Sequence, residues 1–143
     1  MMISTRGRYV LRVLADLAEH DSGAYVPMKD VAARQEISLK YIEKLMPVLT
    51  KNGLVDGVHG KGGGYRLTRP PEDYPIGEIL RLTEGSLAPV ACLENSAPKC
   101  ERAAYCRTLP MWTRFERLVD DFFDKITLAD LIADGENGGD YVI

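Results

Sequence analysis

The N-terminal part of the chain carries apolar side chains at helical spacing in three separate segments. Helices are expected from Thr5, which can cap the first, to about His20, from about Met28 to Gln35, and from Leu39 to about Asn52. Ser38 is well placed to cap the third helix after a tight connection. Pro47 lies inside that helix, and because proline removes a helical hydrogen bond, the sequence predicts a kink or an early break there.

Two short strand-like runs follow, at 54–59 and 65–68, on either side of the glycine-rich segment 60–64. This pattern predicts a β-hairpin with a flexible tip. A helix, a short helix, a tight turn, a third helix and a hairpin form the order of a winged helix-turn-helix. The predicted fold class is therefore mainly α with a small β-hairpin, in which a winged helix-turn-helix DNA-binding domain ends with a helix over about 76–83.

The C-terminal part contains a longer apolar stripe. A long helix is expected from Pro110 to about Ile126, with apolar residues recurring at three and four, and residues 127–130 resemble a capping box for a last short helix to Ile132. The stripe is too rich to be covered by one small domain, which predicts that the long helix pairs with its twin in a homodimer. These patterns divide the chain into a DNA-binding domain (1–84), a cysteine-containing sensor loop (85–108), a dimerisation helix and short terminal helix (109–133) and an acidic, glycine-rich tail (134–143).

Charge is unevenly spread along the chain, although its net value is only −3 over 143 residues. Residues 1–70 hold eleven Lys and Arg against seven Asp and Glu, a balance of +4, whereas residues 120–143 hold one Lys against seven acids, a balance of −6. The basic half is suited to face a phosphate backbone. No apolar run approaches the ~18 residues of a membrane span and no signal-peptide pattern is present, so a cytoplasmic protein without a membrane partner is expected.

The third helix and the hairpin tip carry residues suited to reading duplex DNA. A recognition helix presents polar and capping residues at its N-terminal end to bases and phosphates, and glycines at a hairpin tip permit close approach to a groove. The candidate DNA-binding residues are Ser38, Lys40, Tyr41, Glu43, Lys44, His59 and Lys61. The alternative is an ordinary amphipathic helix with a solvated outer face, in a module that binds protein instead of DNA.

No motif of the sequence indicates catalysis. The glycine run 60–64 does not fit a P-loop, which needs Ser or Thr after its Lys, because Gly62 follows Lys61 here. Neither G-x-S-x-G nor H-E-x-x-H occurs, and no acid/base pair stands out. We therefore expect that the protein is not an enzyme.

The cysteines are concentrated in one short segment, with the spacing Cys92-x7-Cys100-x5-Cys106. Zinc sites favour closer pairs of cysteines, whereas iron–sulfur clusters take thiolates from looser spacings. Three interpretations stay open at this point. The thiols are ligands of a labile cluster, or form a redox switch, or are simply buried or free.

Several of these segments together resemble the Rrf2 family of bacterial transcription regulators, and within it the iron–sulfur-binding, IscR-like branch. The resemblance covers the chain to about residue 132. The matching segments are Ile3-Ser4-Thr5-Arg6-Gly7-Arg8-Tyr9, Ile37-Ser38-Leu39-Lys40-Tyr41-Ile42-Glu43-Lys44-Leu45, Lys51-Asn52-Gly53-Leu54-Val55, Gly60-Lys61-Gly62-Gly63-Gly64-Tyr65-Arg66-Leu67, Ile76-Gly77-Glu78-Ile79 and the three-cysteine loop.

This resemblance implies a homodimer that binds a near-palindromic operator in double-stranded DNA. It also implies a labile iron–sulfur cluster, 2Fe-2S in the first place and 4Fe-4S as the alternative, held by Cys92, Cys100 and Cys106 and sensing iron–sulfur status, oxygen or nitric oxide. The resemblance implies no fourth ligand. Relatives use a histidine shortly after the last cysteine or an acidic residue near the N-terminus, but residues 107–111 contain no histidine and position 8 is Arg8. The alternative is a regulator of the same family controlled by thiol oxidation or a small effector.

Overall fold

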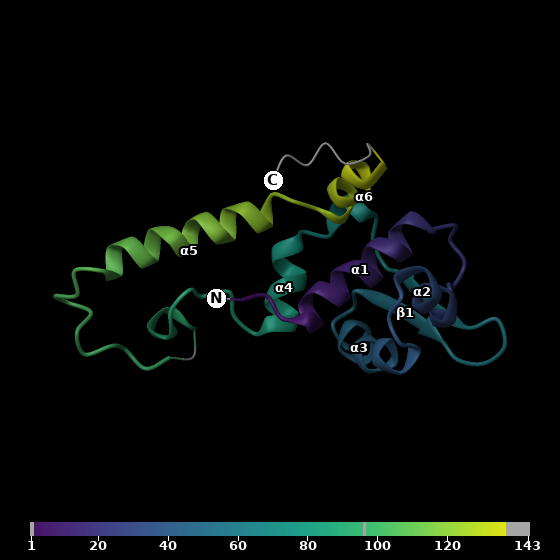
Figure 1. The fold of residues 1–143 in the computed structure, drawn as a ribbon, viewed down its shortest axis with the longest axis horizontal. Coiled ribbons are helices and arrows are strands. Elements are labelled where there is room, and N and C mark those ends of the chain that lie inside the picture. The colour runs from purple at the N-terminus through teal and green to yellow at the C-terminus, as the bar shows by residue number, and fades with distance from the viewer. Residues whose placement is uncertain (1, 96, 137–143) are drawn as a thin grey trace.

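The computed structural model describes residues 2–95 and 97–136. Its N-terminal part is a helix-turn-helix made of α1 (Thr5–Glu19), α2 (Met28–Gln35) and α3 (Leu39–Lys51) (Figure 1). Fully buried side chains from α1 and α3, including Leu14, Leu17, Ile42 and Leu49, meet in one core. The predicted order of the three helices is confirmed, and their boundaries lie within one residue of the expected ones.

The turn between α2 and α3 is closed by backbone geometry and burial. Glu36 ends α2 with a left-handed conformation (φ 55°), and the buried Ile37 donates its backbone N–H to the carbonyl of Ala32 at 3.2 Å. The side chain of Ser38 then accepts a hydrogen bond from the backbone N–H of Tyr41 at 3.1 Å, as an N-cap does. The predicted cap at Ser38 is therefore confirmed.

Two local expectations for the helices are corrected by the structure: Thr5 is not the cap of the first helix, and the early break at Pro47 does not occur, while the alternative of a kink at Pro47 stays a prediction. The N-cap of α1 is Ser4, whose Oγ accepts from the N–H of Gly7 at 3.2 Å, whereas Thr5 is already the first helical residue. The helix α3 also does not break at Pro47. Pro47 and Glu43 both face solvent, so water can satisfy the carbonyl that proline leaves unpaired, while buried side chains on both sides of Pro47 hold the helix in place.

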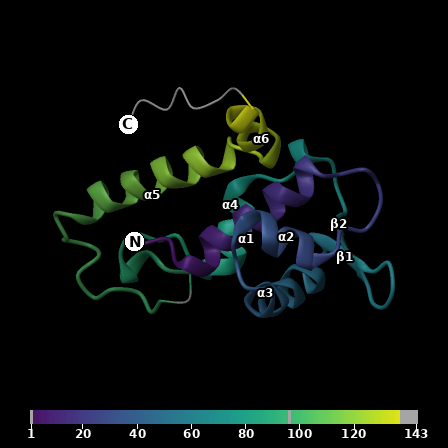
Figure 2. The same cartoon turned by 45° about the vertical axis from the view of Figure 1, so that its right-hand side comes forward.

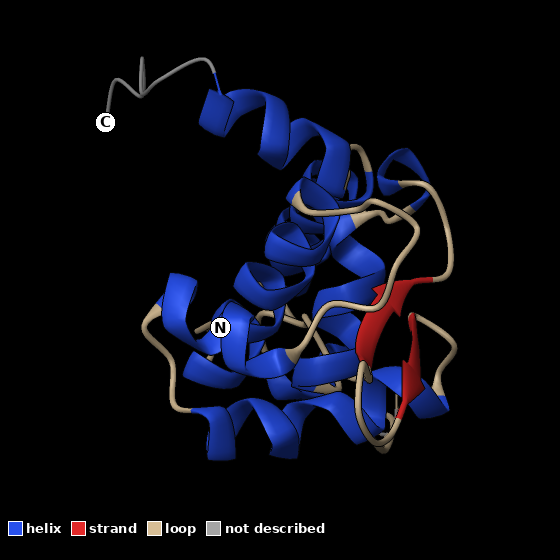
Figure 3. Ribbon diagram, turned by 90° about the vertical axis from the view of Figure 1, so that its right-hand side faces the viewer, coloured by secondary structure: helices blue, strands red, loops and turns tan. Residues whose placement is uncertain are grey.

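The hairpin consists of β1 (Val55–Val58) and β2 (Gly64–Leu67), paired antiparallel with Val55 opposite Leu67 and Val58 opposite Gly64. We call residues 55–67 the wing. Its turn projects beyond the helices in Figure 2, and Figure 3 shows both strands at one edge of the helical body. The fold is therefore mainly α with a small β-hairpin, as predicted.

The rest of the chain leaves this body and returns to it. A short 3-10 turn, η1 (Pro71–Asp73), leads into α4 (Ile76–Glu84), and a long loop containing η2 (Ala91–Leu93) connects α4 to α5 (Leu109–Asp124). The loop and α5 extend away from the other helices (Figure 1). None of the helices in the described ranges has the length and apolarity that a bilayer span requires.

The last helix, α6 (Leu128–Glu136), packs against α1, and its Leu128 is fully buried in the common core. The predicted capping box is confirmed, since Thr127 N–H donates to Asp130 at 2.9 Å and Asp130 N–H donates to the Thr127 hydroxyl at 3.2 Å. The helix runs to Glu136, beyond the expected end at Ile132. The remainder of the expected acidic tail, residues 137–143, lies outside the described residues.

Candidate nucleic-acid interface and cysteine loop

The N-terminal end of α3 presents a cluster of polar side chains. Ser38, Lys40, Glu43 and Lys44 are exposed, and in the described residues neither lysine takes part in an ion pair. Tyr41 is half-buried because its ring packs edge-on against Tyr9 of α1, with ring centroids 5.7 Å apart. The structure therefore brings together the five residues predicted on this helix, and leaves the ammonium groups of Lys40 and Lys44 available to an external anion.

A buried carboxylate that sequence reasoning missed fixes this helix-turn-helix. Asp16 of α1 is 1% exposed and accepts hydrogen bonds from Arg34 at 2.7 Å and from Gln35 at 2.9 Å, both on α2. These bonds satisfy the charge and raise the pKa of Arg34 above its ordinary value. The sequence signal was an aspartate on the apolar face of a helix, which needs a cationic partner when it is buried.

The tip of the wing holds the two remaining predicted residues. His59 and Lys61 are exposed, and each is followed by a glycine with positive φ, Gly60 (93°) and Gly62 (78°) respectively. Glycine is required at these two positions because a side chain disfavours that backbone conformation. The tip thus places a cation and an imidazole on a narrow projection. These two residues and the α3 cluster both belong to the N-terminal half of the chain.

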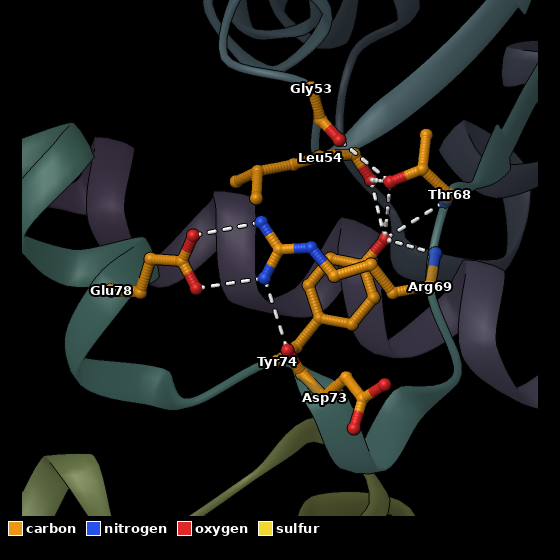
Figure 4. Close-up of polar contacts among 7 residues, drawn as sticks. All are labelled: Gly53, Leu54, Thr68, Arg69, Asp73, Tyr74 and Glu78. Atoms are coloured by element: carbon orange, nitrogen blue, oxygen red, sulfur yellow. Dashed lines mark hydrogen bonds and ion pairs between the residues drawn. The ribbon is translucent and has the colours of Figure 1, made fainter.

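The root of the wing is held by Tyr74, which is fully buried (Figure 4). Its hydroxyl donates to the carbonyl of Leu54 at 2.6 Å and accepts from the backbone N–H of Thr68 at 2.9 Å. Arg69 lies over the Tyr74 ring and donates to both carboxylate oxygens of Glu78 on α4, at 2.8 and 2.9 Å. The bond from Arg69 lowers the pKa of Glu78. Residue spacing could not reveal the bond from Tyr74 to Leu54, because it joins residues 20 positions apart in the chain.

The three cysteines line one cavity of about 130 Å³, together with Lys99 and Leu109. Cys92 and Cys100 are exposed, Cys106 is partly buried, and all three are free thiols. In residues 2–95 and 97–136, no three His, Cys, Asp or Glu side chains are close enough to hold a single metal ion. The thiols therefore share a pocket without forming a compact one-metal site, and further approach depends on movement of the exposed loop.

Cys106 lies just before α5, and its thiol takes part in hydrogen bonds with residues at the start of that helix. Its Sγ is 3.4 Å from the hydroxyl of Thr108, and this hydrogen bond, with further ones from the backbone N–H groups of Thr108 and Leu109, lowers the pKa of Cys106. Hydrogen bonds to sulfur favour the thiolate over the thiol. The residues before Cys106 form hydrogen-bonded turns at 100–105.

The long helix α5 leaves an apolar stripe uncovered. Only Val119 of this helix is buried, whereas large apolar side chains at heptad-like spacing face solvent. Arg81 of α4 fixes the other face of α5 through Asp120 at 2.8 Å and Asp124 at 2.7 Å, which raise the pKa of Arg81. The exposed members of the stripe are Met111, Phe115, Leu118 and Phe122.

Comparisons with known proteins agree with this architecture. A family model named Rrf2 and described as an iron-dependent transcriptional regulator matches residues 3–134. Protein rrf2 of Nitratidesulfovibrio vulgaris is 42% identical over 134 residues, which cover 94% of this chain and 89% of that protein.

Two solved structures are also similar. CymR, titled the global cysteine regulator of B. subtilis, superposes with a TM-score of 0.77 at 33% identity, over 94% of this chain and 98% of that one. T. potens IscR superposes with a TM-score of 0.75 at 34% identity, over 99% of this chain and 93% of that one. Regulators of this kind have a winged helix fold, which agrees with the fold described above.

Proposed function

Because the chain belongs to the Rrf2 family of transcriptional regulators, we propose that it binds operator DNA as a homodimer and that its cysteine loop controls this binding. The observation that carries the proposal is the exposed N-terminal end of α3, where Lys40 and Lys44 form no ion pair within residues 2–95 and 97–136, beside a projecting wing. Its relatives are named transcriptional regulators, so the proposed activity is binding and not catalysis.

In this proposal the N-terminal end of α3 enters the major groove, which is ~12 Å wide and admits one helix. Ser38, Lys40 and Lys44 contact phosphates, Tyr41 supports the helix and reaches the backbone, and Glu43 accepts a hydrogen bond from a cytosine amine. The wing places His59 and Lys61 in the adjacent minor groove or along the backbone. Among the residues that the structure describes, neither Lys40 nor Lys44 has an acidic partner, which supports these roles.

The partner that covers α5 is a second copy of the chain. The stripe of Met111, Phe115, Leu118 and Phe122 repeats at intervals of four and three residues, which is the spacing of a helix–helix seam. A two-fold dimer through this seam presents two α3 helices to a near-palindromic operator, with half-sites ~34–36 Å or a multiple apart.

The cysteine loop is the proposed sensor. Cys92, Cys100 and Cys106 would supply three thiolates to an iron–sulfur cluster. When bound, the cluster would cross-link these three positions of the loop, and oxygen would remove that cross-link by destroying the cluster. The chain's own contribution is to gather three thiols around one cavity and to place Cys106, with its lowered pKa, directly before α5. Ordering of residues 88–108 is thereby coupled to the helix that sets the dimer. The iron-dependent description of the family supports this assignment.

A second candidate keeps DNA binding and replaces the cluster with thiol oxidation. The observation that favours it is the exposed, disulfide-free state of Cys92 and Cys100 beside the thiolate-favouring site of Cys106. Thiol titration before and after peroxide, with duplex binding followed in parallel, separates the two candidates. Protein that loses duplex affinity on oxidation without ever binding iron supports the second.

The DNA-binding proposal is tested by the salt dependence of affinity for a duplex selected from a random-sequence pool. We expect log affinity to fall linearly with log salt, and Lys40→Ala to lower the slope by about one, because one phosphate contact is lost. Lys125→Ala, an exposed lysine directly after α5, serves as the matched control and leaves the slope unchanged. Wild-type protein without salt-dependent duplex binding contradicts the proposal.

The dimer and the cluster are tested separately. Leu118→Glu is expected to give a monomer by light scattering at micromolar concentration, whereas Arg117→Glu, at the neighbouring exposed position, stays dimeric. Anaerobic reconstitution with iron and sulfide is expected to give visible absorbance that Cys92→Ala reduces. Colourless wild-type protein after reconstitution defeats the cluster and leaves the thiol-switch candidate.

A further inference from the structure

The wing has only a short ladder of its own. Each strand is four residues long, and a two-stranded hairpin is marginally stable by itself in water. Its orientation on the protein therefore depends on where it is attached to the helices. The tip residues Lys61 and His59 lie at the far end of this ladder from both chain connections, so a small rotation at the root becomes a larger displacement at the tip.

One attachment is to the connection between α1 and α2. Val26 exchanges both backbone hydrogen bonds with Tyr65 of β2, at 2.8 and 2.9 Å, and Tyr25 donates to Asp56 of β1 at 2.8 Å. These bonds fix the middle of the wing to the segment that connects α1 and α2. They do not by themselves prevent the wing from rotating about that segment, so a second attachment is needed to fix its angle.

Tyr74 supplies the second point, at the open end of the hairpin. Its hydroxyl bridges the residues that flank the two strands, because it donates to the carbonyl of Leu54 before β1 and accepts from the N–H groups of Thr68 and Arg69 after β2, at 2.9 and 3.2 Å. Thr68 adds a hydroxyl bond to the carbonyl of Gly53 at 2.6 Å. One buried oxygen thus joins both roots (Figure 4).

The aromatic ring in turn is clamped to α4. Arg69 lies 4.9 Å from the Tyr74 ring centroid and forms a two-point pair with Glu78, and its guanidinium also donates to the carbonyl of Asp73 at 3.0 Å. A planar guanidinium held by two carboxylate oxygens keeps a defined orientation. The root of the wing is therefore fixed to a helix of the core and not only to its own strands.

We propose that Tyr74 is a positioning residue for DNA binding, whose hydroxyl holds the wing at the angle at which Lys61 reaches the duplex. This inference rests on the proposed function. It adds a residue that is fully buried and absent from the set predicted to contact DNA. A tyrosine that only stabilised the core would affect all DNA contacts alike, whereas a positioning residue affects the wing contact selectively.

The test is a double-mutant cycle on duplex affinity at 0.1 M salt, with the wild type, Lys61→Ala, Tyr74→Phe and the double variant. Loss of one phosphate contact predicts about eightfold weaker binding for Lys61→Ala in the wild-type background. In the Tyr74→Phe background we expect this penalty to fall below about twofold, since the wing no longer places Lys61 on the backbone. The parallel cycle with Lys40→Ala on α3 is the matched control, and its penalty stays the same in both backgrounds.

Equal Lys61→Ala penalties in both backgrounds overturn the inference, and so does an equal loss of the Lys40 and Lys61 penalties. A wild type that binds duplex without any Lys61 penalty also overturns it, while leaving DNA binding through α3 intact. If the wild-type protein binds no duplex, the proposed function itself is contradicted. If circular dichroism shows that Tyr74→Phe does not fold, Glu78→Gln, which breaks the Arg69 pair at a half-exposed site, carries the same cycle with the same expected direction.

Discussion

The wing and the cysteine loop are both poor in regular structure, yet the protein holds them in opposite ways. The wing and its root form hydrogen bonds between residues 20 to 43 positions apart, namely Tyr74 with Leu54 at the root, Arg66 with Gly23, and Tyr25 with Asp56. In the described part of the loop between Ser86 and Thr108, hydrogen bonds join only residues two to four positions apart. A segment with only local bonds can reorder at low cost, and a segment with long-range bonds cannot.

Burial and charge follow the same division. Leu87 is the one buried side chain in the described part of the loop, and no ion pair forms there, whereas the wing and its root contain the pairs Arg66–Asp56 and Arg69–Glu78. The difference fits the separate tasks that we propose for the two regions. A rigid wing suits a surface that must match the shape of a duplex, and a compliant loop suits a site that changes when it gains or loses a ligand.

The largest expected effect on stability comes from replacing a tyrosine at the root of the wing, and a tyrosine in the cysteine loop provides the comparison. Tyr74→Ala removes a fully buried ring and the hydroxyl that joins both strand roots, so we expect a loss of about 3–5 kcal/mol in the free energy of unfolding. Tyr105→Ala in the loop removes a ring that is 66% exposed, and its effect is expected to stay within about 0.5 kcal/mol. Urea denaturation of both variants measures the difference. Similar losses would show that the loop is held as firmly as the wing.

The sequence predicted the helices and the hairpin well because their signals are local. Apolar spacing places α1 and α3, Ser38 marks the start of α3, and glycines mark the wing tip. The predicted break at Pro47 was wrong, because the buried face of α3 stabilises the helix more than one proline destabilises it.

The site was only partly accessible to the same reasoning. The three cysteines are close in sequence, so their common cavity was foreseeable, as was the uncovered stripe of α5. The bonds of Tyr74 to Leu54 and of Arg81 to Asp120 and Asp124 join segments 20 to 43 residues apart. No periodicity encodes such contacts, since they arise only when packed helices bring the partners together.

A smaller effect on stability is expected when either of two glycines with positive φ is replaced by alanine. Gly64 in β2 has φ 155° and packs so closely on the backbone carbonyl of Val26 that a Cβ would collide with it, whereas Gly85, at the start of the cysteine loop, has φ 80° with open space around it. We expect Gly64→Ala to cost about 2–3 kcal/mol, from backbone strain and displacement of the wing. Gly85→Ala carries only the strain of its φ, about 1 kcal/mol. Thermal unfolding of both variants measures the costs, and equal costs would mean that the wing accommodates the methyl group by moving.

The smallest effect concerns pH and the ion pair at the wing root. Arg69 lowers the pKa of Glu78, so the pair stabilises the folded state above the carboxyl's unfolded pKa of about 4.3, and this contribution is lost as pH falls through the lower folded value. Because Glu78 is 45% exposed, solvent screening limits the contribution to about 0.5 kcal/mol. Glu78→Gln is therefore expected to be less stable than the wild type by that amount at pH 7 and equal to it at pH 3, in urea denaturation at both pH values.

The matched control for this titration is Glu94→Gln, at an exposed position of the cysteine loop that forms no ion pair in the described residues. It is expected to keep the wild-type difference in stability between pH 7 and pH 3, because its carboxylate has no cationic partner to lose. If Glu94→Gln changed that difference as much as Glu78→Gln does, charge would be anchoring the loop as it anchors the wing. The loop would then resist reordering, and a sensor built on its compliance would lose its physical basis.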